Sequence, residues 1–190
     1  MSAFEFFFSL FGLILGLAIA TVISGLSDLY RQRERVAIGW LTPMLALFVL
    51  CDLSTLWVNA WTGLSAISVA YGPFFSALII AGIYFFAASM VFPKTTSDWP
   101  SLDDYYMSHR RFVIPGVMAA NLGLGLVHGA ITRDWVGFAR DTFAHSNMTI
   151  TWWIVLTVMF LISRKSVQLI GLGILLLGSV FALIQYWGAP

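Results

Sequence analysis

Long apolar stretches, separated by short polar connections, make up most of the chain. Crossing the hydrocarbon core of a bilayer takes about 20 apolar residues in a helix. Within a few residues, six stretches meet this length: 4–29, 38–61, 67–92, 112–131, 148–163 and 167–187. A helix pairs its own backbone groups, which lipid cannot do. The pattern predicts an all-α integral membrane bundle of six transmembrane helices, in a single domain over residues 1–190.

Lys and Arg residues are distributed unevenly between the connections. Eight of the ten fall between the first and second, the third and fourth, or the fifth and sixth stretches: Arg31, Arg33, Arg35, Lys94, Arg110, Arg111, Arg164 and Lys165. Cytoplasmic loops carry the excess of positive charge, so both termini are expected on the periplasmic side. A signal peptide begins with a positive region, and none precedes the first stretch, which is therefore expected to be a retained helix.

Two connections are long enough to form short helices at the membrane surface. Ser101 and Asp104 have the spacing of a capping box, which predicts an interfacial helix over 102–111. Four of its side chains are expected at the level of lipid headgroups: Tyr105, Tyr106, Arg110 and Arg111. A second interfacial helix is expected near 133–144, where Trp135 and Phe138 share a face. We interpret it as an anchor on the outer surface, with a lid over an outward-facing cavity as the alternative.

The first apolar stretch has a small residue at every fourth position. The four residues are Gly12, Gly16, Ala20 and Ser24, and Gly125 and Gly129 repeat the spacing in the fourth stretch. Small residues spaced in this way let two helix backbones approach closely in lipid, where packing supplies the attraction. The first stretch is therefore predicted to be the surface against which the other helices pack.

Two ionisable residues lie inside apolar stretches, Asp52 in the second and His128 in the fourth. Such groups are costly in a membrane and usually face the interior of the bundle. At 1.5 Å per residue, Asp52 is roughly 21 Å from the start of its stretch and His128 roughly 24 Å from the start of its own. Both are therefore expected in the outer half of the bilayer. Three amide side chains are expected to support them: Asn59, Asn121 and Gln185.

This polar set has two interpretations, and the sequence leaves both open. Histidine titrates near neutral pH, which favours a relay for protons or cations, or a site for a polar solute. Hydrogen bonds between transmembrane helices average only about 0.6 kcal/mol, so the same residues could instead fix the register of the helices.

Composition removes several other kinds of function. Charged residues make up 10% of the chain and the mean hydropathy is +0.88, whereas soluble domains carry about 25% charge. The net charge of +1 gives no basis for binding nucleic acid. His109, His128 and His145 fall in a cytoplasmic, a membrane and an outer region, so no shared metal site is expected. No motif for a covalent cofactor appears, and a bound lipid or pigment is left open.

Two segments resemble an uncharacterised group of small bacterial polytopic membrane proteins. The first is Phe4-Glu5-Phe6-Phe7-Phe8 followed by Gly12–Leu17, and the second is Leu102-Asp103-Asp104-Tyr105-Tyr106 with Arg110-Arg111-Phe112. The resemblance implies a location in the bacterial inner membrane. It brings with it no activity, cofactor or site residue.

Three hypotheses of function follow from the sequence. The first is a small transporter or channel for protons, small ions or a polar solute, acting through Asp52 and His128. The second is a structural or accessory subunit that packs through its glycine stripes, as a homo-oligomer or in a larger membrane complex, in contact with membrane lipids. The third is a lipid-modifying enzyme, in which Asp103, Asp104 and His109 would act.

Overall fold

The computed structural model describes residues 3–34, 36–63, 71–185 and 187, and within them the ordered elements are helical. In chain order these are α1 (Ala3–Arg31), α2 (Leu41–Gly63), α3 (Tyr71–Ser89), the 3₁₀ helix η1 (Thr96–Asp98), α4 (Leu102–Thr132), α5 (Trp135–Ala139), the π-helix η2 (Arg140–Ala144), α6 (Asn147–Leu161) and α7 (Lys165–Gln185). The predicted all-α helical bundle is confirmed.

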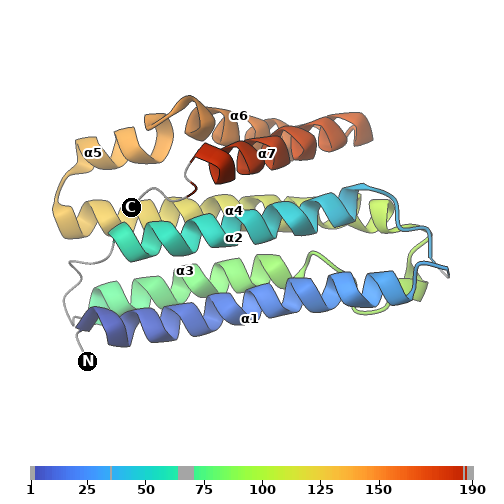
Figure 1. Ribbon diagram of the computed structural model, residues 1–190, viewed down its shortest axis with the longest axis horizontal. Helices are drawn as coiled ribbons and strands as arrows, with labels where there is room; N and C mark the ends of the chain where they lie inside the picture. The colour runs from blue at the N-terminus through green and yellow to red at the C-terminus, as the bar shows by residue number, and fades with distance from the viewer. Residues whose placement is uncertain (1–2, 35, 64–70, 186, 188–190) are drawn as a thin grey trace.

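In the part of the chain that the structure describes, the six longer helices lie side by side in three pairs (Figure 1): α1 runs parallel to α3, α2 runs parallel to α4, and α6 runs antiparallel to α7. The middle pair separates the outer two, so α2 packs against α1 and α7, and α4 packs against α3 and α6. The buried core runs through the whole bundle along these contacts. The central helices are therefore α2 and α4, and α1 lies at one side.

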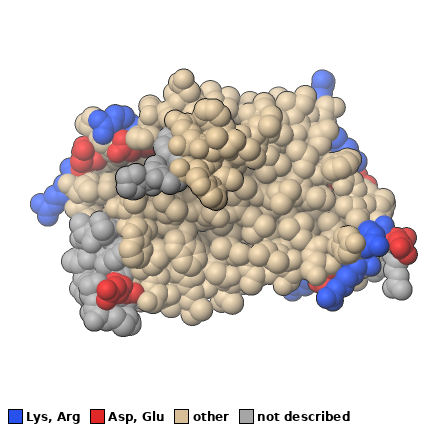
Figure 2. Space-filling view, viewed as in Figure 1, with Lys and Arg blue, Asp and Glu red and all other residues tan. Residues whose placement is uncertain are grey.

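Length and composition identify the chain as a multi-pass membrane protein. Among the residues that the structure describes, five helices are long and apolar enough to cross a membrane: α1, α2, α3, α4 and α7. Helix α6 has 15 residues, about 22 Å at 1.5 Å per residue. It makes a sixth span only together with α5 and η2, from which it is bent by 72°. On the face seen in Figure 2, charged side chains lie at the two ends of the bundle, with a band of uncharged residues between them.

One end of the bundle is where α1 ends and where α2, α4 and α7 begin. We name it the basic end. On the face seen in Figure 2, blue Lys and Arg side chains gather there. The connection before α2 is held against the start of α4: the Leu102 amide donates to the Ala37 carbonyl (3.0 Å). The carboxylate of Asp103 accepts from the Leu41 amide (2.9 Å) and so caps α2 from another helix. Gly39, at φ +66°, faces that carboxylate so closely that a Cβ would overlap it.

The separate interfacial helix predicted over 102–111 is not present, because these residues are the first turns of α4. Its predicted cap is present, since Ser101 Oγ accepts from the Asp104 amide (3.2 Å). The helix then continues without a break through Pro115 to Thr132, over 31 residues. That corresponds to about 46 Å, longer than the roughly 30 Å of a hydrocarbon core. A short helical segment does occupy 135–144, as expected, in the form of α5 and η2.

The prediction that the small-residue stripe of α1 packs against the other helices is wrong for most of the stripe. Gly12 meets Trp57 of α2, but Gly16 has open space around it and Ala20 and Ser24 are exposed. The buried face of α1 is instead a stripe of apolar, mostly larger residues: Phe11, Leu15, Ala18, Val22 and Leu29. Packing of apolar side chains along this stripe supplies the contact of α1 with its neighbours.

Glycines of α4 allow close helix packing. A Cβ at Gly116 would lie 2.7 Å from Cβ of Ala87, and one at Gly123 would lie 2.9 Å from Ile80, so these glycines admit α3. Gly125 and Gly129 lie against the segment α5–η2, whose Phe138 is close to both. Small residues on α4 therefore let it pack closely on two sides.

Candidate functional site

Four described residues with polar or charged side chains are buried: Thr42, Asp52, Arg110 and Gln168. They belong to different parts of the bundle. Asp52 lies at the middle of the molecule, whereas Arg110 and Gln168 lie together toward the basic end. We name the two groupings the Asp52 cluster (Asp52, Tyr84, Asn121 and Trp152) and the Arg110 cluster (Tyr106, Arg110, Ser163 and Gln168).

Asp52 occupies one position in the buried stripe of α2. The stripe follows helical spacing and is otherwise apolar: Leu45, Val49, Leu56 and Ala60. Asp52 is 7% exposed and lies eleven residues from either end of α2, about 16 Å at 1.5 Å per residue. The side chain is therefore at the midpoint of its span, deeper than the outer half that the sequence predicted.

Three neutral donors from three other helices bind the carboxylate. Tyr84 of α3 donates its hydroxyl to Oδ2 (2.7 Å), and Asn121 of α4 donates Nδ2–H to the same oxygen (2.9 Å). Trp152 of α6 donates its indole N–H to Oδ1 (3.2 Å). Asp52 thus joins four helices at one point, through hydrogen bonds that all run toward its oxygens.

The Tyr84 hydroxyl has a second acceptor within reach. Its oxygen lies 3.4 Å from the backbone carbonyl oxygen of Val49, one turn before Asp52 on α2. A carbonyl oxygen has two lone pairs, so it can accept from a hydroxyl as well as from its own helix. Rotation of one O–H bond would therefore move the Tyr84 proton from the carboxylate to the carbonyl.

The Asp52 cluster contains no cation. Within α2, α3 and α6, all of whose residues the structure describes, Asp52 is the single Asp, Glu, Lys or Arg. Burial of a carboxylate without a counter-ion costs much more than burial of a neutral amide of similar size, even when its oxygens are hydrogen-bonded. The cluster therefore contains one group whose charge the surrounding side chains do not neutralise.

His128 does not join the Asp52 cluster. Its Nδ1 is hydrogen-bonded to the carbonyl oxygen of Gly63 at the end of α2 (2.7 Å). Asn121, the α4 residue that does bind Asp52, lies seven residues earlier on the helix, about 10 Å along the axis. The two predicted relay residues are thus bonded at two separate levels of the α2–α4 interface.

The other predicted supporting amides differ in the same way. Asn121 is half-buried and binds Asp52, whereas the side chains of Asn59 and Gln185 are exposed near the ends of α2 and α7. Of the five residues predicted as one polar set, the structure brings Asp52 and Asn121 together. Two further members, Tyr84 and Trp152, were not predicted from the sequence. A signal for Tyr84 exists, because a tyrosine in an apolar span needs a partner for its hydroxyl when it is buried.

The Arg110 cluster corrects the headgroup prediction. Tyr105, Tyr106 and Arg110 are 4%, 1% and 1% exposed, and only Arg111 of the four is exposed. The Arg110 guanidinium donates to the carbonyl oxygens of Met159 and Phe160 and to Ser163 Oγ. Helix α6 ends at Leu161, so Arg110 binds carbonyl groups that the helix end leaves unpaired. A cation at a helix C-terminus also complements its dipole.

Gln168 of α7 completes this cap. Its amide donates to the carbonyl oxygens of Met159 (2.8 Å) and Ile162 (2.6 Å), and its own oxygen accepts from the Tyr106 hydroxyl (2.6 Å). The cluster therefore ties α4 and α7 to the end of α6. Tyr106, Arg110 and Gln168 are buried beside the end of α6, and their own positions in the sequence did not indicate this.

The residues of the enzyme hypothesis have structural contacts. Asp103 caps α2, and Asp104 accepts from Lys165 of α7 (2.7 Å) and from Ser101. His109 stacks on Tyr105, with ring centroids 4.1 Å apart, and Trp99 packs edge-on against both rings. Asp103, Asp104 and His109 thus each contact a different part of the basic end.

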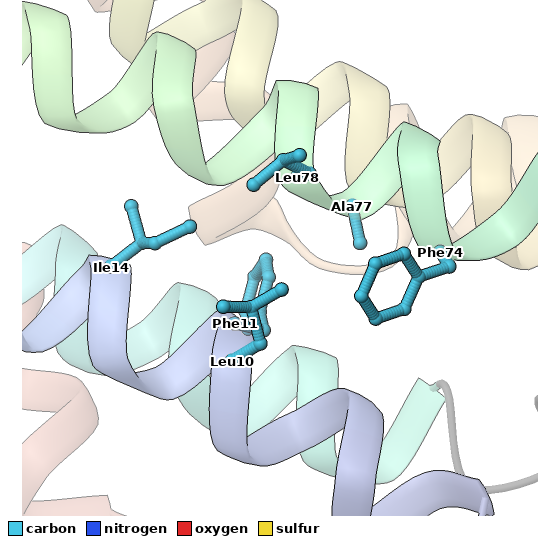
Figure 3. A pocket seen from close by; sticks show the side chains of 6 residues that line it. All are labelled: Leu10, Phe11, Ile14, Phe74, Ala77 and Leu78. Carbon is cyan, nitrogen blue, oxygen red and sulfur yellow. The ribbon is translucent and has the colours of Figure 1, made fainter.

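The structure gives two further observations on binding sites. A small apolar pocket lies between α1 and α3 (Figure 3), lined by Leu10, Phe11, Ile14, Phe74, Ala77 and Leu78. Such a lining fits hydrocarbon and offers no polar group to a solute. Among the described residues, no group of three or more His, Cys, Asp or Glu side chains could hold a metal ion.

Comparisons with protein-family models, with curated proteins and with solved structures returned no match to this chain. No activity or site residue is therefore carried over from a relative. The resemblance to small bacterial polytopic membrane proteins stays a prediction.

Proposed function

We propose that this membrane protein is a small transporter or channel, in which Asp52 binds the proton or small ion that is moved. The observation that supports this most strongly is a lone carboxylate at the midpoint of a span, held by neutral donors from three other helices. Ionisable groups inside membrane proteins commonly mark ion and proton pathways. The charge asymmetry supports an orientation with the basic end in the cytoplasm, and the resemblance supports a bacterial inner membrane.

A purely structural role would be served better by a neutral residue. An asparagine at position 52 could accept from Tyr84 and Asn121 through its carbonyl oxygen and would lose only the bond from Trp152, without the cost of a buried charge. Where a junction of helices contains a carboxylate with no cation, the property gained over asparagine is the ability to change protonation state. This argument favours transport over a structural knot at Asp52.

The experiment that tests the proposal is a flux assay on purified protein in liposomes, with a pH-sensitive dye inside and an imposed pH gradient. Asp52→Asn keeps the shape of the side chain and removes its titration. We expect flux to fall at least tenfold, to the level of empty liposomes, while size-exclusion and circular dichroism profiles stay unchanged. Asp141→Asn, the same change at an exposed carboxylate, is the matched control and should retain flux.

His128→Ala tests whether the pathway includes the second level of the α2–α4 interface. If His128 belongs to it, flux falls while the Asp52 cluster stays intact, since the two are bonded separately. Unchanged flux in Asp52→Asn would overturn the proposal. The same result in His128→Ala would remove only the histidine from it.

One observation favours the second candidate, an accessory subunit of a larger complex or a homo-oligomer. Gly16 has open space around it, and Ala20 and Ser24 are exposed on the same face of α1. A small-residue stripe left exposed in lipid is a surface on which another helix could pack. Native mass spectrometry of Gly16→Leu should then show loss of a partner chain. Gly82→Leu, at an equally open glycine of α3, should keep the partner; no partner in the wild type would reject this candidate.

A further inference from the structure

We propose that the Asp52 site is selective for a proton over metal cations, and that the Tyr84 hydroxyl is the group that adjusts when the proton binds. This rests on the proposed function, in which Asp52 binds the transported species, and it names that species. It also assigns a positioning role to a residue that the sequence did not single out.

The first argument is the direction of the hydrogen bonds around the carboxylate. Tyr84, Asn121 and Trp152 each point a hydrogen at an Asp52 oxygen. Hard cations such as Na⁺, Mg²⁺ and Ca²⁺ are bound by several oxygen lone pairs at once. A cation on Asp52 would instead face the positive ends of one O–H and two N–H bonds. Two of these donors, the indole N–H of Trp152 and the amide N–H of Asn121, have no nitrogen lone pair with which to bind a cation.

The second argument concerns the backbone near the site. Transporters that bind metal ions at the membrane midplane commonly use carbonyl groups freed where a helix is interrupted. Helices α2 and α3 run continuously past Asp52 and Tyr84. In α4, Pro115 lies six residues before Asn121, and the helix continues through it. In α2, α3 and α4 the carbonyls at the level of the carboxylate are therefore engaged within their own helices, and α6 begins at Asn147, five residues before Trp152.

A proton can be accommodated by reorienting hydrogens alone. A hydronium ion loses a proton and becomes water, and the proton forms a new O–H bond on Asp52 Oδ2. That group donates to the Tyr84 oxygen across the present 2.7 Å contact. The Tyr84 O–H rotates and donates to the carbonyl oxygen of Val49, now 3.4 Å away. Asn121 and Trp152 keep acceptor lone pairs on the carboxyl group. Release of the proton to water reverses each step, so no buried donor is left unpaired in either state.

Among the groups around the site, Asp52 is the one whose charge changes when a proton binds. Cys51 is its neighbour on α2, Tyr84 is the titratable group from α3, and α4 and α6 contribute the neutral Asn121 and Trp152. Further ionisable residues of the surrounding long helices lie toward helix ends: Glu5, Asp28 and Arg31 on α1, Tyr71 on α3, the 103–111 segment and His128 on α4, and Lys165 on α7.

The test is an infrared titration of the full chain in lipid nanodiscs. The carbonyl stretch of protonated Asp52 is identified as the band that Asp52→Asn removes, and its midpoint is measured in choline chloride and then in NaCl, LiCl, KCl or CaCl₂ at equal ionic strength. We expect the same midpoint in every salt. A competing cation would move it by about one pH unit for each tenfold rise in cation concentration, by mass action, and that would overturn the proposal.

Tyr84→Phe tests the adjusting hydroxyl in the same measurement. The protonated carboxyl then loses its acceptor, so its carbonyl band should move to higher frequency. Tyr71→Phe, at an 81% exposed tyrosine of the same helix, should leave the band in place. An unmoved band in Tyr84→Phe, or no band that depends on Asp52 at any pH, contradicts the proposal. If Tyr84→Phe does not fold, the salt series on the wild type still decides it.

Infrared and flux results separate the two proposals. An Asp52 band that titrates independently of salt, in a protein without flux, would support the proton-selective site and reject transport. Flux that depends on Asp52, together with a midpoint that moves with Na⁺, would support transport and reject the proton as the species moved.

Discussion

The two polar clusters bury charges of opposite sign, and each includes one tyrosine and one side-chain amide. In the Arg110 cluster, a cation meets carbonyl oxygens at the end of α6. In the Asp52 cluster, an acid meets neutral donors from α3, α4 and α6. An arginine stays charged at any pH at which the protein would be handled, whereas a carboxylic acid can gain or lose a proton. The comparison assigns stability to one cluster and chemistry to the other.

The clusters also differ in whether the groups around the buried charge would need a hydrogen-bond partner in its absence. The carbonyls at the end of α6 have no partner within their own helix, so Arg110 satisfies an existing need. Apolar side chains could stand in place of Tyr84, Asn121 and Trp152 without leaving any backbone group unpaired. These three donors are therefore required only because Asp52 is buried there. A costly group whose partners exist on its account is more typical of function than of folding.

Arg110→Leu should have the largest effect on stability. It leaves the Met159 and Phe160 carbonyls without their charged donor, and we expect the free energy of unfolding to fall by about 3 kcal/mol. The measurement is denaturation in mixed detergent micelles followed by circular dichroism. Arg111→Leu, at the exposed neighbour, is the control and should change stability by about 0.5 kcal/mol or less. Equal effects at the two positions would show that burial of Arg110 is not what matters.

A second prediction uses two amides, one from each cluster. Gln168→Leu removes three hydrogen bonds and should lower the free energy of unfolding by about 2 kcal/mol, because carbonyls of Met159 and Ile162 lose a donor. Flux through folded protein should keep its wild-type rate and pH dependence, since no group that changes charge is touched.

Asn121→Leu should show the reverse balance. It removes one donor from Asp52 Oδ2, so the loss of stability is smaller, about 1 kcal/mol. The pH profile of liposome flux should shift, because an amide that binds the carboxylate acts unequally on its two protonation states. If Gln168→Leu shifts the profile as much as Asn121→Leu does, the division of roles between the clusters is wrong.

The position of a residue along its helix could be predicted from the sequence, because each residue adds a fixed rise. The apolar stretches gave α1, α2, α3 and α7 to within a few residues, and Asp52 stood out as an acid in an apolar run. The boundary of α4 was missed because its first turns are polar yet continue the same backbone hydrogen bonding. The sequence placed Asp52 too near the outer surface, because α2 begins at Leu41 and not at Ile38.

The sequence by itself determined a membrane bundle, its charge asymmetry and the presence of a buried acid, because apolar length and charge act through the solvent that each residue meets. Tertiary structure decided the partners. Which face of α3 turns toward α2, and so brings Tyr84 to Asp52, depends on how glycines of α4 admit α3. Whether Arg110 faces headgroups or protein depends on where α6 ends. Spacing fixes height along one helix, whereas the angle between neighbours is set by side chains of all the helices packing at once.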